Sequence, residues 1–150
     1  MDPTLYRQLI GSLMYLLNTR PDMNFAVKTL SQFMVEEPRR VHWTAAKHIL
    51  RYLAGTADYG LDYRRSSGVG LVSYTNLDWA GSVSNRKSTS GCCFSLGLTV
   101  VLWFSRKQES VALSFAEVEY MAASQASYEA LWLRKLMVDL FDMESSPTII

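Results

Sequence analysis

Three carboxylates in the second half of the sequence have the residue types that metal-assisted chemistry uses. Asp78 follows an apolar segment with strand character, and Glu117 and Glu119 lie in a helical segment further along the chain. Two Mg²⁺ ions about 4 Å apart need several oxygen ligands that converge on one point. Helical positions two apart diverge by about 200°, so only one of Glu117 and Glu119 can face a common site. The other is left to cap the helix or to face solvent. The residues alone leave two interpretations open, a metal site and a set of surface acids.

Other catalytic patterns are not indicated by the sequence. It contains no G-x-S-x-G segment, and neither His42 nor His48 has an obvious partner, so we expect both histidines to be structural or solvent-facing. Cys92 and Cys93 are adjacent, and neighbours on a strand point to opposite faces, so we expect no disulfide between them.

Basic side chains offer a second kind of site. Residues 1–75 carry nine basic and six acidic residues, whereas residues 76–150 carry six and eight. Arg40, Lys47 and Arg51 lie on the polar side of one predicted helix, where they could contact phosphates or form an ordinary solvated face. Trp79 follows Asp78 directly and is a candidate for base stacking, whereas Trp43 and Trp132 are expected in the core.

Three helices are predicted before any strand. Pro21 ends the first helix, whose apolar positions are Leu5, Leu9, Leu13, Leu16 and Leu17. A second helix is expected from about Pro21 to Met34, with Phe25, Ala26, Thr29, Leu30 and Phe33 on its buried face. A third is expected from about Arg39 to Ala54, with Trp43, Ala46, Ile49, Leu50 and Leu53 on its buried face.

Strands and a long helix are predicted for the remainder. Leu61 and Tyr63 alternate like a strand, residues 70–75 form the next one, and a hairpin turns at Gly97. A helix is predicted from Leu113 to about Asp142, with Ser114 and Glu117 at capping-box spacing and a candidate break at residues 124–127. Residues 147–150 have the pattern of a strand that begins there. The predicted fold class is α+β.

Composition sets the broad class of the protein. The chain has 150 residues, of which 49% are hydrophobic and 19% charged, and this balance is typical of a globular protein. No apolar run approaches the roughly 20 residues of a transmembrane helix, and no secretory signal opens the chain. We therefore expect an intracellular protein, cytoplasmic or nuclear, without membrane association.

Several segments together resemble copia-type (Ty1/copia) retrotransposon Pol polyproteins. Residues 6–16, 19–22, 42–43 and 51–56 resemble the end of the reverse transcriptase. Residues 78–81, 86–91, 103–108 and 117–122 resemble the ribonuclease H domain that follows it, in the same order. The resemblance implies a helical thumb- or connection-like segment at residues 1–57. It also implies a truncated ribonuclease H-like domain at residues 58–150, with a mixed sheet and a packed helix.

The resemblance also implies which residues would form the site. Ribonuclease H domains of this family cut the RNA strand of an RNA–DNA hybrid with acidic residues and two Mg²⁺ ions. The family usually has Asp-x-Asp-Trp-Ala-Gly where this chain has Asn76-Leu77-Asp78-Trp79-Ala80-Gly81, so Asn76 replaces the first metal-bridging acid. Glu119 matches the second acid, and the later acids would follow Ile150. The implied catalytic positions are Asn76, Asp78 and Glu119, with Asp78 and Glu119 as the metal ligands.

An amide is a poor bridge between two Mg²⁺ ions, so we expect a catalytically inactive domain that acts by binding nucleic acid or protein. The expected partner is an RNA–DNA hybrid or another nucleic acid, bound through Arg40, Lys47, Arg51 and Trp79. The alternatives are a residual or repurposed metal-dependent hydrolase, a translated relic without a role, and unrelated small-molecule chemistry. We further expect Ile149 and Ile150 either to pair as a short strand or to contribute to a homodimer through an exposed sheet edge.

Overall fold

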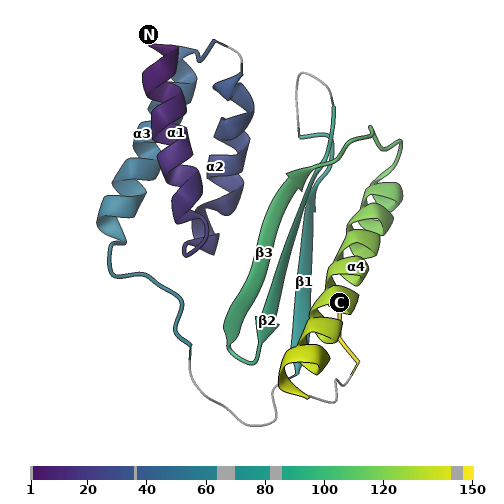
Figure 1. Ribbon diagram of the computed structural model, residues 1–150. Helices are drawn as coiled ribbons and strands as arrows, with labels where there is room; N and C mark the ends of the chain where they lie inside the picture. The colour runs from purple at the N-terminus through teal and green to yellow at the C-terminus, as the bar shows by residue number, and fades with distance from the viewer. Residues whose placement is uncertain (1, 36, 64–69, 82–85, 143–146) are drawn as a thin grey trace. The chain divides into compact units, whose positions relative to one another are not determined.

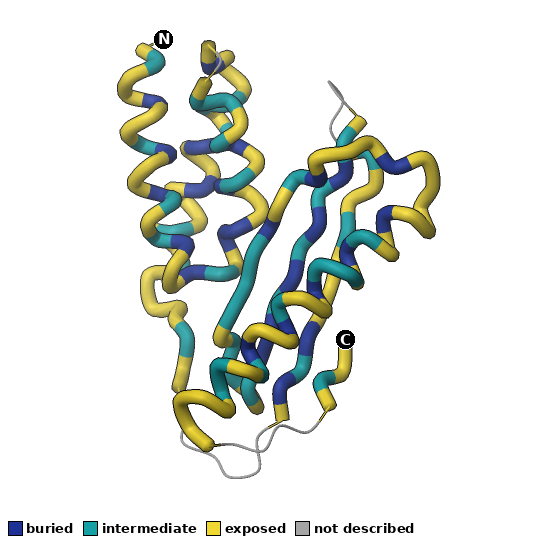
Figure 2. The backbone as a smooth tube through the Cα atoms, turned by 45° about the vertical axis from the view of Figure 1, so that its right-hand side comes forward, coloured by how far each residue is buried: buried dark blue, intermediate teal, exposed yellow. Residues whose placement is uncertain are grey.

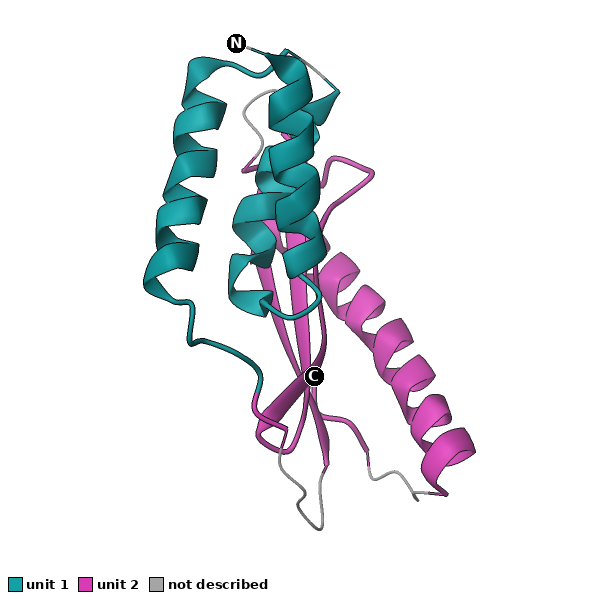
Figure 3. Ribbon diagram, turned by 60° about the vertical axis from the view of Figure 1, so that its left-hand side comes forward, with its two compact units in different colours: residues 1–61 teal, residues 62–150 magenta. Residues whose placement is uncertain are grey.

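The protein is described by a computed structural model that covers residues 2–35, 37–63, 70–81, 86–142 and 147–150. The chain divides into two compact units, residues 1–61 and residues 62–150 (Figure 3). Each unit has its own cluster of buried apolar side chains. The predicted class α+β is confirmed, because the first unit is helical and the second contains an antiparallel sheet with one long helix.

The first unit contains three α-helices and two short 3₁₀ turns (Figure 1). These are α1 (Pro3–Leu16), η1 (Pro21–Met23), α2 (Asn24–Ser31), η2 (Gln32–Met34) and α3 (Arg40–Gly55). Asp2 caps α1, because its carboxylate accepts a hydrogen bond from the Thr4 N–H at 2.8 Å. Pro21 opens η1, which agrees with the predicted break between the first two helices.

Tyr6 is the largest fully buried side chain of the first unit. Its hydroxyl donates to the Leu30 carbonyl at 3.0 Å, and its ring meets that of Trp43 edge-on at 5.6 Å. The predicted buried faces of α1 and α3 are largely confirmed, with Leu5 and Leu50 as exposed exceptions, whereas that of α2 is rotated, because Phe25 is exposed and Val27 is buried. The residues that fill the core are Tyr6, Ile10, Leu13, Leu17, Met23, Val27, Leu30, Ala46 and Ile49.

The second unit is built on a three-stranded antiparallel sheet. Its strands are β1 (Leu71–Asp78), β2 (Thr89–Leu96) and β3 (Thr99–Lys107), in the order β1-β2-β3. Gly97 makes the predicted hairpin turn with a φ of 65°, a conformation that suits glycine. The strand predicted around Leu61 and Tyr63 is wrong. That segment contacts β3 through single hydrogen bonds, such as Thr99 Oγ1 to the Asp62 carbonyl at 2.8 Å, and forms no ladder.

Helix α4 (Phe115–Phe141) runs for 27 residues and covers one face of this sheet (Figures 1 and 2). Small side chains, among them Ala122, Ala126 and Ala130, form its buried side and let the helix approach the strands. The predicted break at residues 124–127 does not occur, since α4 is continuous through this segment, where the Ser127 hydroxyl donates to the Ala123 carbonyl. Trp132, predicted in the core, is 54% exposed, because it lies on the side of α4 away from the buried alanines.

The chain end returns to the sheet. Ile149 forms a parallel bridge with Val72, and the Ser73 N–H donates to the Ile149 carbonyl at 2.9 Å. Pairing of the chain end was one of the two alternatives expected, but it is limited to an isolated bridge at Ile149 and does not extend to Ile150. None of the helices in the described part of the chain has the length and hydropathy of a membrane span.

Candidate functional site

The end of β1 carries two of the predicted site residues. Strand alternation places Asn76 and Asp78 on one face of the sheet, whereas Leu71 packs beneath α4 on the other. Both polar side chains are exposed. The Asn76 amide turns onto its own backbone, because its Oδ1 accepts a hydrogen bond from the Leu77 N–H at 2.9 Å. The Asn76 side chain is therefore a neutral amide whose oxygen already accepts one backbone hydrogen bond.

A tight turn fixes the residues that follow Asp78. Ala80 has a φ of 51°, and its N–H donates to the Oγ of the fully buried Ser88 at 3.1 Å. The Asp78 carboxylate lies over Gly81, at the position that a Cβ on that residue would occupy. Gly81 thus leaves the space in which the Asp78 carboxylate sits.

Aromatic rings connect this turn to the start of α4. The Trp79 and Phe115 rings are perpendicular, with an interplanar angle of 84° and centroids 6.3 Å apart. Each ring is about half exposed. The end of β1 and the first turn of α4 are therefore neighbours, which is where the sequence places its candidate acids.

The two glutamates of α4 have different roles. The Glu117 Oε2 accepts from the Leu113 N–H at 2.7 Å, and the Glu117 N–H donates to the Ser114 Oγ at 3.2 Å. Ser114 is therefore the predicted N-cap, but the reciprocal bond of a capping box is not formed, because the Glu117 carboxylate accepts from Leu113 and not from the Ser114 N–H. Glu119 is exposed one position from the buried Val118.

A magnesium centre at this edge of the sheet would need several carboxylates that converge on one point. Within the described ranges, no three carboxylate, histidine or cysteine side chains come together where they could hold a metal ion. Asp78 and Glu119 project from different elements, and the Asn76 amide adds no charge. The described residues do not fit a two-Mg²⁺ site, which needs several converging oxygen ligands.

The predicted basic residues form one exposed face of α3. Arg40, Lys47 and Arg51 are spaced by seven and four positions, so they lie on the same side of the helix. All three are exposed, and no ion pair in the described part of the chain involves them. We call these residues the basic face of α3. Their charges are available to an anionic ligand.

Sequence reasoning missed a charged network beside this face. Arg20, only 6% exposed, binds both Asp22 oxygens, with Nη2 2.8 Å from Oδ2, and also the Thr56 carbonyl and hydroxyl. The Tyr52 hydroxyl donates to Asp22 at 2.8 Å. The hydrogen bonds from Arg20 hold the pKa of Asp22 below its ordinary value. The only signal in the sequence was an arginine next to Pro21 and two residues before an aspartate.

A second polar network lies where β2 and β3 meet the turn. The buried Gln108 donates from its backbone N–H to the Ser88 carbonyl at 2.8 Å and from Nε2 to the Ser90 Oγ at 2.8 Å. Its Oε1 is buried without a partner among the described residues, so it requires a donor from solvent. Sequence reasoning missed this network, since glutamine after a strand carries no specific signal.

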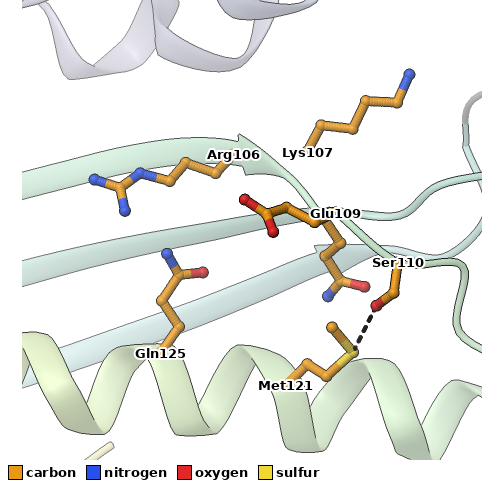
Figure 4. Close-up of a pocket in the computed structure, with 7 residues that line it drawn as sticks. Arg106, Lys107, Glu109, Ser110, Met121 and Gln125 are labelled. Carbon is orange, nitrogen blue, oxygen red and sulfur yellow. Dashed lines mark hydrogen bonds between the residues drawn. The ribbon is translucent and has the colours of Figure 1, made fainter.

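Gln108 also lines a cavity of about 550 Å³ between the end of β3 and α4. Arg106 from β3 and Gln125 from α4 lie across this cavity from each other (Figure 4). At its end the Ser110 hydroxyl contacts the Met121 sulfur at 4.0 Å. The cavity is polar, with two cationic side chains, one carboxylate and two amides among its lining groups.

Comparison with known proteins gives several relatives. The chain is 50% identical over 129 residues to Secreted RxLR effector protein 161 of Plasmopara viticola, covering 85% of this chain and 90% of that protein. It is 42% identical over 149 residues to the retrovirus-related Pol polyprotein from transposon RE2 of Arabidopsis thaliana, covering 99% of this chain and 10% of the polyprotein. The Pol polyprotein from transposon TNT 1-94 of Nicotiana tabacum is 42% identical over 136 residues, which are 90% of this chain and 10% of that protein.

The chain thus spans most of the Plasmopara protein but about a tenth of each polyprotein. No protein-family model matches it. No solved structure matches it either.

Proposed function

Because this chain belongs to the copia-type retrotransposon Pol polyproteins, we propose that it is a ribonuclease H-like domain, preceded by a helical unit, that binds nucleic acid without cleaving it. The observation that carries this proposal is the basic face of α3. Arg40, Lys47 and Arg51 present three exposed charges on one side of a rigid helix. Phosphates spaced along a nucleic-acid backbone are the natural ligands of such a face.

Asn76 supports the non-catalytic part of the proposal. An acid at this position would supply negative charge between two metal ions, whereas the amide is neutral and its Oδ1 already accepts from Leu77. Asp78 and Glu119 remain as the only acids of the implied set. Removal of the shared charged ligand is expected to abolish metal-dependent cleavage rather than to slow it modestly.

Trp79 supports binding of a partly unstacked strand or a hybrid. Its ring is 48% exposed and is held edge-on to Phe115, so its free face is available to a base. Stacking of one base on an aromatic side chain contributes about 1–3 kcal/mol and depends little on sequence. We therefore propose weak binding with little sequence preference, which weakens steeply with salt.

The test is fluorescence polarisation with a labelled RNA–DNA hybrid, duplex DNA and single-stranded RNA at several salt concentrations. Lys47→Ala/Arg51→Ala should weaken binding about tenfold and flatten the slope of log K against log salt by about 1.5, since two phosphate contacts are lost. Lys28→Ala/Arg86→Ala is the matched control, because it removes the same charge from two residues that do not belong to the basic face of α3. Equal weakening by both double variants would contradict the proposal, since it would indicate a response to net charge alone.

Residual cleavage of hybrids by a divalent-metal-dependent hydrolase is the second candidate function. The neighbouring positions of Trp79 and Phe115 favour it, because they bring the end of β1 to the start of α4. A cleavage assay in Mg²⁺ and in Mn²⁺ should show no activity for the wild type. Activity that Glu119→Gln abolishes would overturn the non-catalytic proposal. Asn76→Asp, assayed beside the wild type, measures how much cleavage activity returns when a carboxylate is restored at this position.

A further inference from the structure

Helix α4 has an outer face that the sheet does not cover. It consists of Tyr120, Ser124, Ser127, Tyr128, Leu131 and Lys135, on the side opposite the buried alanines, and we call it the outer face of α4. We propose that this face binds the same face of a second copy of the chain, with the two helices antiparallel. The proposal is independent of nucleic-acid binding, because none of its residues belongs to the basic face of α3.

The middle of the outer face of α4, from Tyr120 to Leu131, carries no charged side chain. Tyr120, Tyr128 and Leu131 are 78%, 75% and 61% exposed. Between them, the small residues Ser124 and Ser127 leave a hollow of about 400 Å³, which also borders Ala123. Clustered exposed aromatic and aliphatic side chains with a hollow between them are typical of an interaction surface.

The hollow and its neighbour Leu131 are complementary to each other in an antiparallel pair. If the two-fold axis passes between Ser127 and Tyr128, then Leu131 of each copy lies opposite Ser124 of the other. Each leucine then enters the hollow of the facing helix, and the contact is made twice. A two-fold interface requires this kind of self-complementary patch, in which one residue is the knob and another the hole.

Charge selects the antiparallel over the parallel arrangement. The α4 helix begins with Glu117 on this side and carries Lys135 towards its end. Antiparallel pairing brings Lys135 of one copy close to Tyr120 and Glu117 of the other, where cation–π and ionic attraction act together. Parallel pairing would instead place like charges beside each other, and the helix dipoles would also repel.

The size of the contact predicts a weak dimer. From Glu117 to Val138 the helix is about 30 Å long, and a single helix face about 10 Å wide buries less than the roughly 800 Å² per partner of a stable complex. We therefore expect a dissociation constant between about 10 μM and 1 mM, so that the dimer forms only in concentrated solution.

The test is sedimentation equilibrium of the full chain between about 10 μM and 1 mM, a range suited to an interface of this size. The wild type should shift from monomer to dimer within this range. Leu131→Ser should raise the dissociation constant at least tenfold, because the substitution removes a buried contact from both halves of the interface. Leu5→Ser is the matched control, since Leu5 is 55% exposed on α1 and should leave the dimer unchanged. Circular dichroism establishes that both variants are folded.

Two further variants distinguish a dimer formed through the outer face of α4 from one formed through the sheet edge. Lys135→Glu should weaken the dimer severalfold, and 0.5 M salt should reduce the difference from the wild type. Deletion of residues 147–150, which removes the Ile149 bridge, should not affect association. A chain that stays monomeric to about 1 mM would overturn the proposal. So would a dimer that tolerates Leu131→Ser, or one that is altered by the deletion, since the latter would indicate pairing through the sheet edge.

Discussion

At the scale of single residues, the Arg20 guanidinium joins parts of the helical unit that are far apart in the sequence. It binds Asp22 beside it and Thr56 at the end of α3. Tyr52 adds a hydrogen bond to the same carboxylate. Asp22 therefore stabilises the turn after α1 and the end of α3 at once.

Asp22→Asn should lower the free energy of unfolding by about 2 kcal/mol, because a nearly buried guanidinium loses its charged partner. Asp58→Asn, at an exposed aspartate, is the control and should change it by less than about 0.5 kcal/mol. Urea denaturation monitored by circular dichroism measures both. Equal effects of the two variants would show that the network contributes nothing specific.

The lowered pKa of Asp22, caused mainly by the Arg20 hydrogen bonds, gives this contribution a pH dependence. Its stabilisation is complete above the pKa of the unfolded state, about 3.9, and is lost as the pH falls through the lower pKa of the folded state. The difference between the wild type and Asp22→Asn should therefore shrink only below about pH 4. A difference that already disappears between about pH 5 and 7 would contradict the assignment to this carboxylate.

A second testable contact at this scale is that between Gly81 and the Asp78 carboxylate. A Cβ there would overlap the Asp78 carboxylate, so Gly81→Ala should displace that side chain at a cost of less than about 1 kcal/mol, because the carboxylate is the exposed end of a flexible side chain. In an Asp78→Ala background the penalty should vanish, and this coupling is what a double-mutant cycle measures. Gly11→Ala is the control, because open space surrounds it on α1 and alanine should stabilise the helix.

At the scale of elements, the start of α4 depends on Glu117. Glu117→Ala removes the acceptor of the Leu113 N–H and should cost about 1 kcal/mol of stability. Glu119→Ala, two positions along and exposed, should have little effect. Thermal unfolding of the two variants compares them directly. A larger loss for Glu119→Ala would indicate that Glu119 has the structural role instead.

Local signals were enough to predict some elements and not others. The hairpin at Gly97 and the N-cap at Ser114 were predictable, because a turn glycine and a cap act on neighbouring residues. The buried face of α2 was not, since which side faces inward depends on contacts such as that of Tyr6 with Leu30. The alternation of Leu61 and Tyr63 is typical of a strand, but this segment pairs with no strand of the described sheet.

The candidate site was predictable only in part for the same reason. Sequence order placed Asp78 after a strand and Glu119 on the helix, and the structure agrees with both positions. The contact of Trp79 with Phe115 depends on how the chain folds back over 36 residues, which no local pattern encodes. The partners of Arg20 are equally distant, because Thr56 lies 36 residues further along.

At the scale of the whole molecule, the two units have separate cores. The buried cluster of the first unit ends at Ile49, and that of the second begins at Leu71. Ile10→Ala should therefore lower the protection of amides from hydrogen exchange in residues 3–55 and leave residues 71–141 protected. Phe94→Ala should do the reverse. Loss of protection in both units from either substitution would show that they unfold as one.

The Val72–Ile149 bridge has a consequence for the order in which the chain folds. It joins residues 77 positions apart and so closes a loop around the whole second unit with a single backbone hydrogen bond. Closure of so long a loop has a large entropic cost, and little local structure offsets it, so the bridge should form after the hairpin and α4 are in place. Protection of the Ser73 amide, which donates to Ile149, therefore marks the time at which this last step of folding occurs. Its exchange with solvent should report the docking of the chain end separately from the stability of the sheet.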